Sequence, residues 1–270
     1  MTAAPWIVSD ELWALIEPLL PKKERHFRYP GRRRFDDRLA LQGILFVLHT
    51  GIAWQQLPVE LGFGSGVTCW RRLDEWQRAG VWGRLHALLL ARLRAAGELE
   101  WSRAIADSSQ VQAKKGAPKT GPSPVDRGRP GCKHHLLVDA TGIPLAFTVT
   151  GGNRNDVTQL IPLLDAVPAV AGLRGRPRRR PDTLIADRGY DHDKYRRLVR
   201  ERGVKPLIAR RQTEHGSGLG RHRWVVERTF AWLHNLKRLR VRYERRADIH
   251  HALLALGCCL VCYRRLRSSI

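Results

Sequence analysis

The spacing of apolar residues divides the chain into a helical first third and a mixed remainder. Between residues 8 and 97, apolar positions recur three and four residues apart in four segments, as in amphipathic helices. Ser9 and Asp36 precede the first two segments and are residue types that cap helices, and Gly51 is expected to end the second. The basic stretch 21–34 reads as a loop. We therefore predict an all-helical domain over residues 1–97.

From residue 98 onward, short apolar runs alternate with helical segments. The pattern predicts helices at 157–167, 191–202, 221–239 and 247–266, and strands at 103–107, 132–139, 144–150, 183–186 and 205–209. The segment 111–130 is rich in Lys, Gly and Pro and predicts a basic loop. This order predicts an α/β domain with a mixed sheet over residues 98–270.

Net charge narrows the class of partner. The chain of 270 residues has 48 Lys and Arg against 25 Asp and Glu, a net charge of +23. The excess is concentrated, because residues 171–246 hold 23 basic and 8 acidic side chains. Such a chain favours a polyanion, and phosphate binding by Lys and Arg is strongly salt-dependent. These charges do not lie opposite an exposed apolar helix face, which argues against a membrane partner.

Other features of composition exclude further classes. The sequence shows no run of about 18 uncharged apolar residues and no basic segment typical of a secretory signal at its start. We therefore expect a cytoplasmic protein. Cys258, Cys259 and Cys262 lie in an apolar run and are interpreted as buried packing residues rather than metal ligands. The tryptophans at 13, 70, 76 and 82 follow the helical period and are assigned to the core.

Two helices of the first domain suggest contact with DNA. A glycine-rich turn separates the second and third helices, and Arg71 and Arg72 lie off the apolar stripe of the third. This arrangement resembles a helix-turn-helix. Any helical bundle with solvated arginines would show the same pattern. A DNA-binding helix-turn-helix and a helical bundle without that function therefore both stay open.

Three acids suggest a metal site. Asp107 and Asp187 each end a predicted strand in the same local sequence, Ile-Ala-Asp, and catalytic groups gather at strand ends in α/β sheets. Glu227 lies in a helix that is otherwise apolar and basic, where an acid is costly to bury unless it is paired or metal-bound. A salt bridge to an arginine would explain any one of them. All three together favour divalent cations, which bind carboxylate oxygens. His134 and His135 are adjacent on a strand and point to opposite faces, so they do not form one site.

Several separated motifs now point to one family. The segments IADSSQVQAKKG, GPSPVDRGRPGCKHHLLVD, TGGNRNDVTQLIPLLD, LIADRGYD and RWVVERTFAWL resemble, in this order, the DDE transposases of bacterial insertion sequences, in the family numbered five. The N-terminal segments LIEPLLP and GILFVLHTGIAWQQLP resemble the helical domain that precedes the catalytic domain there. The likeness covers residues 8–266.

The resemblance implies a ribonuclease-H-like fold, DNA transposition and two Mg²⁺ or Mn²⁺ ions per active site. By this resemblance, the three catalytic acids of the family correspond to Asp107, Asp187 and Glu227. Gly189 and Tyr190 match the Gly and the aromatic residue of the family motif Asp-x-Gly-aromatic that begins at the second acid. The family pattern Tyr-(2)-Arg-(3)-Glu-(6)-Lys is matched at Arg223 and Glu227, whereas Gly220 and His234 replace the Tyr and the Lys. Lys237 and Arg238 follow about one turn later and are expected to contact phosphate instead.

The implied partner is double-stranded DNA, both the terminal inverted repeats and the target, bound by a homodimer or larger assembly at the bacterial nucleoid. The expected DNA contacts are Arg71, Arg72, Lys114, Lys115, Arg188, Tyr190, Arg223, Arg228, Lys237 and Arg238. Tyr190 either stacks on a base or packs beneath the site. Two alternatives remain: a DNA-binding protein that has lost activity, and a nuclease of the same fold that cleaves without joining strands.

Overall fold

The N-terminal part of the protein is helical, as predicted. The computed structural model describes residues 4–22, 28, 33–212 and 220–268, so most of the predicted loop at 21–34 lies outside the described residues. The elements before the sheet are α1 (Asp10–Ile16), α2 (Asp37–Thr50), α3 (Gly66–Arg78), α4 (Val81–Ala95) and the 3-10 turns η1 (Glu17–Leu19), η2 (Trp54–Gln56) and η3 (Val59–Leu61). Both predicted caps are confirmed: the Leu12 amide donates to Ser9 Oγ and the Leu39 amide to Asp36 Oδ1. Gly51 ends α2 with φ 75°.

A mixed sheet forms the centre of the second part, which confirms the predicted α/β class. Its strands are β1 (Ala104–Ala113), β2 (Gly121–Pro122), β3 (Pro130–Asp139), β4 (Pro144–Gly151), β5 (Thr183–Ala186), β6 (Lys205–Ile208) and β7 (Val241–Arg242). The five longest follow the order β4-β3-β1-β5-β6. β3 runs antiparallel to β1 and β4, whereas β5 is parallel to both β1 and β6.

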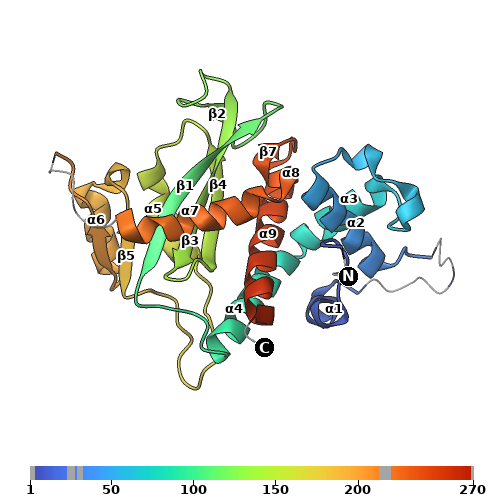
Figure 1. Cartoon of the computed structure of the whole chain (residues 1–270), viewed down its shortest axis with the longest axis horizontal. Helices are drawn as coiled ribbons and strands as arrows, with labels where there is room; N and C mark the ends of the chain where they lie inside the picture. The colour runs from blue at the N-terminus through green and yellow to red at the C-terminus, as the bar shows by residue number, and fades with distance from the viewer. Residues whose placement is uncertain (1–3, 23–27, 29–32, 213–219, 269–270) are drawn as a thin grey trace.

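Helices pack around this sheet and join it to the N-terminal part. They are α5 (Leu160–Ala166), α6 (Asp193–Glu201), α7 (Gly220–His234), α8 (Lys237–Arg240) and α9 (Ala247–Ser268), with the 3-10 turns η4 (Asp156–Gln159) and η5 (Arg188–Tyr190). α7 crosses the sheet and contacts β1, β3 and β5 (Figure 1). α9 stands between the sheet and the N-terminal helices, in contact with α3, α4 and β4 (Figure 1).

One continuous hydrophobic core runs through both parts. α9 is long and apolar enough to cross a membrane by length and composition, yet 78% of its apolar window is buried inside the protein. Cys258, Cys259 and Cys262 are buried in this helix, as predicted. Trp76 and Trp82 are also buried and pack edge to face, with ring centroids 5.9 Å apart. The N-terminal helices are therefore not a loosely tethered module, because α4 shares its core with α9.

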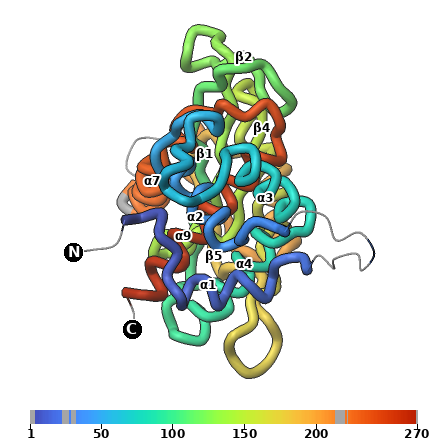
Figure 2. The backbone as a smooth tube through the Cα atoms, turned by 90° about the vertical axis from the view of Figure 1, so that its right-hand side faces the viewer, coloured from blue at the N-terminus to red at the C-terminus, as the bar shows by residue number. Residues whose placement is uncertain are grey.

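Two predicted boundaries were wrong. β1 does not end at Asp107 but continues to Ala113, because its pairing with β3 extends from Ala104 to Gln112. The predicted helix 221–239 is interrupted: α7 ends at His234, and Leu236 is extended (φ −79°, ψ 96°) before α8 begins. The chain between β1 and β3, which includes β2, projects at one end of the molecule (Figure 2).

The turn between β3 and β4 fixes α7 on the sheet. Asp139 accepts hydrogen bonds from the amides of Thr141 and Ile143, and Gly142 adopts φ 97°, which favours glycine. The Thr229 hydroxyl of α7 donates to the Gly142 carbonyl at 2.8 Å. The Arg228 guanidinium donates to the Thr141 carbonyl at 2.6 Å. These two hydrogen bonds between α7 and the β3–β4 turn set the position of the residues on α7 that face the sheet.

Candidate active site

Asp107 lies on β1 where the pairing with β5 ends. The β1–β5 ladder runs through Ala104 and Ile105 only, so the strands separate before Asp107. The amide of Ser108 donates to Asp107 Oδ1 at 2.8 Å, which holds one carboxylate oxygen. The other oxygen, Oδ2, faces α7 and accepts a hydrogen bond from Arg223. The carboxylate is therefore oriented, with one oxygen tied to the backbone and one directed at the helix.

Asp187 directly follows β5 and caps the turn η5. The amide of Gly189 donates to Asp187 Oδ1 at 2.8 Å. A Cβ at position 189 would lie 2.9 Å from the same oxygen, which is closer than real Cβ contacts. Glycine at this position thus allows the backbone to hold the carboxylate. Asp187 Oδ2 is the oxygen that lies nearest Arg223.

Arg223 brings the two aspartates together. Its Nη2 lies 3.0 Å from Asp107 Oδ2 and 4.0 Å from Asp187 Oδ2. Both oxygens are therefore within 4.0 Å of one nitrogen, although they are 80 positions apart in the sequence. The predicted convergence of these two acids is present in the structure.

Glu227 lies one helical turn after Arg223 on α7, with an exposed side chain. Burial disfavours the charge on Arg223, but the carboxylates of Asp107, Asp187 and Glu227 raise its pKa above the ordinary value. Glu227 is thus electrostatically coupled to the same guanidinium as the two aspartates. Asp107 and Asp187 lie within 4.0 Å of this guanidinium, whereas the described residues show no ion pair within that distance between Arg223 and Glu227.

The charge at Asp107 is incompletely compensated. Burial raises the pKa of this carboxyl, and the charge of Asp187 raises it further, while the Ser108 amide and Arg223 lower it; the net shift is upward. A single arginine does not offset the cost of burying this carboxylate beside a second one. Oxygen donors from three carboxylates suit a hard divalent cation.

Tyr190, three residues after Asp187, is 1% exposed. Burial raises the pKa of its hydroxyl well above the ordinary value, and the charges of Asp107, Asp156 and Asp187 raise it further. Of the two roles expected for Tyr190, the structure places it in packing.

Asp156 is a fourth acid that we did not predict. It begins η4 and forms an ion pair with Lys133 at 2.9 Å. Asp156 lies five residues after β4 ends, whereas Asp187 directly follows β5, so the signal that identified Asp187 does not apply to Asp156.

The predicted DNA contacts fall into two groups by their surroundings. Arg71, Lys114, Lys115 and Lys237 have exposed side chains. Lys115 lines a groove between the N-terminal helices and the sheet, together with Trp70 and Arg245. Arg188 lies in η5, immediately after Asp187. Lys237 follows Glu227 by ten residues and begins α8, beyond the end of α7.

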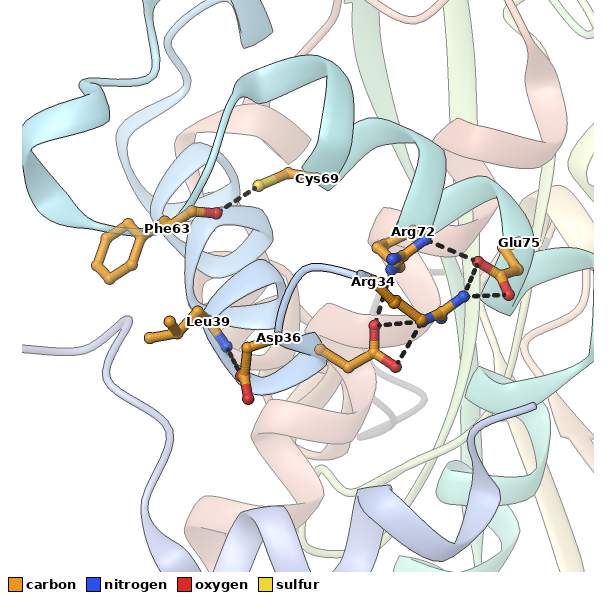
Figure 3. A network of polar contacts seen from close by, with 8 residues as sticks. Arg34, Asp36, Leu39, Phe63, Cys69, Arg72 and Glu75 are labelled. Carbon is orange, nitrogen blue, oxygen red and sulfur yellow. Dashed lines mark hydrogen bonds and ion pairs between the residues drawn. The ribbon is translucent and has the colours of Figure 1, made fainter. Parts of the chain in front are cut away.

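The second group has internal partners. Arg72 donates to Asp37 at 2.7 Å and to Glu75 at 3.2 Å, within a network that also includes Arg34 (Figure 3). Arg238 is 5% exposed and donates to Glu244 at 2.7 Å and to the carbonyl of Ile52. These contacts hold helices together, so we leave both arginines out of the proposed DNA surface.

The two departures from the family pattern have visible consequences. Gly220 begins α7 and offers no side chain. His234 ends α7, and its ring lies 6.1 Å from that of His134, between centroids. Burial and the charge of Arg240 lower the pKa of His234. This position therefore presents a neutral, inward-facing group where the family has a cation.

Cys132, His134 and His250 form a second cluster, buried between β3 and α9. His134 Nε2 and His250 Nε2 are 2.8 Å apart, which is a hydrogen-bond distance. Two nitrogens on one tetrahedral zinc ion, each about 2.0–2.1 Å from it, would lie roughly 3.3 Å apart. Burial lowers the pKa of both histidines, and the positive charge of Arg242 lowers it further. We interpret this cluster as a polar contact within the core. His135 instead contacts Thr150 on β4, which confirms that the adjacent histidines point to opposite faces.

Comparison with known proteins finds relatives among the products of insertion sequences. The chain is 64% identical, over 154 residues, to a putative transposase for insertion sequence element IS402 from Burkholderia cepacia, covering 57% of this chain and 73% of the relative. A second IS402 product of that organism, an uncharacterized 16.2 kDa protein, is 59% identical over 119 residues, covering 44% of this chain and 81% of the relative. A solved pre-cleavage Mos1 transpososome aligns over 92% of this chain and 82% of that chain, at 13% identity and a TM-score of 0.29, too low to support a conclusion.

Two family models match the sequence itself. Residues 8–86 match a model described as a putative transposase of the IS4/5 family. Residues 102–262 match the model of the transposase DDE domain, and this range contains all three carboxylates described above. The chain belongs to the family of DDE transposases.

Proposed function

We propose that Asp107, Asp187 and Glu227 form the catalytic centre of this transposase, which cleaves strands at the ends of its insertion sequence and joins them to target DNA. The observation that carries the assignment is the convergence of Asp107 Oδ2 and Asp187 Oδ2 on one Arg223 nitrogen, at 3.0 and 4.0 Å. Glu227 adds a third carboxylate one helical turn from Arg223.

The donor set suits two Mg²⁺ or Mn²⁺ ions. Arg223 already places a positive charge between Asp107 and Asp187, yet burial still raises the pKa of Asp107. This region therefore favours additional positive charge. When bound, two divalent ions would make the attacking hydroxyl group more acidic and stabilise charge on the leaving oxygen.

The surrounding residues of the chain orient the acids and hold DNA. The amides of Ser108 and Gly189 fix one oxygen of each aspartate, leaving the other directed at the shared space. Arg223 keeps the aspartates together before DNA binds and lies close enough to contact a phosphate there. Lys114 and Lys115, on the chain that projects beyond β1, supply charge for a longer DNA segment.

We infer that the partners are the terminal inverted repeats and a target duplex. Exposed Arg71 on α3 supports contact between the N-terminal helices and DNA. Cleavage at two ends requires at least a homodimer on DNA. The nucleoid of a bacterial cytoplasm is the corresponding location.

The test is a cleavage and joining assay with synthetic duplexes of the inverted repeats that border the gene. Wild-type protein in Mg²⁺ or Mn²⁺ is expected to cut at the repeat end and to join that end to a second duplex. Asp187→Asn and Glu227→Gln are expected to retain DNA affinity and lose cutting. Cutting without joining would indicate a nuclease, and binding without cutting a protein that has lost activity. Full cutting by either variant would remove that residue from the centre.

A further inference from the structure

An arginine-rich loop connects α5 to β5, and it projects at the end of the molecule opposite β2 (Figure 2). Residues 171–180 hold five arginines and no acidic residue. Every residue from 171 to 177 is exposed. The loop begins the segment 171–246, in which the positive charge of the chain is concentrated, yet the proposed catalytic centre makes no use of it.

The base of this loop is held in a defined position. Val170 and Arg178 exchange two backbone hydrogen bonds, at 2.9 and 3.0 Å, which close the loop. The Arg94 side chain of α4 donates to the Val170 carbonyl. Gly172 has φ 108°, and the Ala91 carbonyl of α4 leaves no room for a Cβ at this position. The loop therefore packs directly on the backbone of α4, and its shape is set by the rest of the fold.

Two of the five arginines hold the loop in place. The Arg178 side chain forms an ion pair with Asp182, and its guanidinium lies 5.4 Å from the centroid of the Trp101 ring. Arg180 donates to Asp165 at 3.0 Å. Both arginines are only partly exposed, so their charges are compensated within the protein.

The other three arginines, Arg174, Arg176 and Arg179, have no such compensation. All three are exposed, and among the described residues no carboxylate forms an ion pair with them. Arg176 and Arg179 line the same surface groove. Like charges that are held close together repel one another and disfavour the folded state. A bound polyanion would remove this repulsion.

The position of the loop determines which part of a DNA molecule it can reach. The loop precedes β5, whereas Asp187 directly follows β5. The four residues of this strand, at about 3.3 Å each, separate the loop from Asp187 by roughly 13 Å. A phosphate group bound at the carboxylates is therefore out of reach of these arginines, which must contact a different part of the DNA.

We propose that Arg174, Arg176 and Arg179 form a second DNA-binding site, which takes the phosphate backbone of a duplex away from the bond that is cut. This inference rests on the proposed function. Duplex DNA carries one negative charge per about 1.7 Å of helix axis, so a duplex that passes this end of the sheet presents several phosphates to the loop. Guanidinium groups bind phosphate oxygens through paired hydrogen bonds, and such contacts do not depend on base sequence.

The test compares wild type with two triple variants. Arg174→Gln, Arg176→Gln and Arg179→Gln together remove the charge, whereas Arg174→Lys, Arg176→Lys and Arg179→Lys together keep it. The affinity of each protein for inverted-repeat duplex DNA is titrated at several salt concentrations. Loss of three phosphate contacts is expected to reduce the slope of log affinity against log salt by about 2.7 in the glutamine variant. Between about 50 and 200 mM salt, its affinity should then fall by a factor about 40 times smaller than that of wild type.

The lysine variant is the matched control and is expected to keep the wild-type slope. All three proteins should have the same Tm, because the substituted side chains have no acidic partner among the described residues. Equal losses of slope in the glutamine and lysine variants would overturn the proposal, since attraction of phosphate by charge survives the change to lysine.

A second measurement identifies the source of the DNA. The joining of a cut repeat end to a separate target duplex is followed over the same range of salt. A loss of slope for the repeat duplex assigns the loop to the insertion sequence itself, whereas a loss confined to joining assigns it to the target. Unchanged affinity and unchanged joining in the glutamine variant at every salt concentration would overturn the proposal.

Two other outcomes are distinguishable from these. If the glutamine variant changes the oligomeric state of the DNA-free protein but neither the affinity nor the joining, the loop belongs to an interface between copies and the proposal is wrong. The slope for the repeat duplex is measured without cutting. A wild-type protein that binds this DNA but does not cut it therefore contradicts the proposed function, while the slopes of the variants still decide whether the loop binds DNA.

Discussion

Arg223 Nη2 donates to Asp107 Oδ2 across 3.0 Å, from the helix that crosses the sheet to the strand at its centre. The same nitrogen lies 4.0 Å from Asp187 Oδ2. The guanidinium thus gathers two carboxylates that would otherwise repel each other. The positive charge of Arg223 reduces the repulsion between Asp107 and Asp187, and bound metal ions would add further positive charge there.

Arg223→Gln is expected to make the protein depend on divalent ions for stability. Without the guanidinium, Asp107 loses a hydrogen bond in a half-buried position, which costs about 1–3 kcal/mol. We expect a lower Tm in chelator and a larger rise in Tm on adding Mn²⁺ than wild type shows. Thermal unfolding with and without Mn²⁺ measures both. An equal Mn²⁺ effect in the two proteins would show that Arg223 and the ion act at separate places.

Asp107→Asn is expected to stabilise the metal-free protein while abolishing cutting. Burial raises the folded-state pKa of Asp107 above its ordinary value of 3.8. A raised carboxyl pKa means that the charged form destabilises the fold at neutral pH, and this penalty fades as the pH falls. The variant should therefore have the higher Tm at pH 7, by about 2–4 °C for each kcal/mol. The gain should shrink towards pH 4, and a lower Tm for Asp107→Asn at pH 7 would contradict this account.

Gly189→Ala is expected to impair cutting without unfolding the protein. The added Cβ would lie 2.9 Å from Asp187 Oδ1, so the carboxylate or the turn must shift. A displacement of this kind in a catalytic group costs roughly a hundredfold in rate. Gly83→Ala is the control, because a Cβ there meets nothing within 4 Å. Cleavage rates and Tm values of both variants check the prediction, which fails if Gly189→Ala cuts at the wild-type rate.

The sequence was sufficient to predict those parts of the fold that depend on contacts between residues close together in the chain. Ser9 and Asp36 cap helices because their side chains accept hydrogen bonds within three residues, and such contacts do not depend on the rest of the fold. The extent of β1 was not predictable in this way. Ser108, Ser109 and Gln110 directly after Asp107 are polar, yet they remain in the strand because β3 pairs with β1 from Ala104 to Gln112.

The candidate site residues also divide into those that local sequence indicates and those that depend on tertiary contacts. Asp107, Asp187 and Glu227 were predicted because each is an acid in an unusual local setting. The partners of the arginines depend on tertiary contacts, so charge alone did not separate exposed Lys115 from Arg238, which is buried beside Glu244.

Adjacent arginines on α3 provide the test of the N-terminal helices. Arg71 is exposed, whereas Arg72 is held by Asp37 and Glu75. Deletion of residues 1–97 would expose the face of α9 that packs on α4, so point variants are more informative. Arg72→Ala is expected to cost about 1–3 kcal/mol of stability, because the partly buried carboxylates of Asp37 and Glu75 each lose one of their two arginine partners, the other being Arg34.

Arg71→Ala is expected to keep the wild-type Tm and to bind inverted-repeat DNA more weakly. Loss of one phosphate contact should reduce the slope of log affinity against log salt by about 1. Titrations at several salt concentrations measure that slope, and thermal unfolding measures the stability of both variants. An unchanged slope for Arg71→Ala would place α3 outside the DNA surface, and the exposed lysines after β1 would then have to account for binding near the repeats.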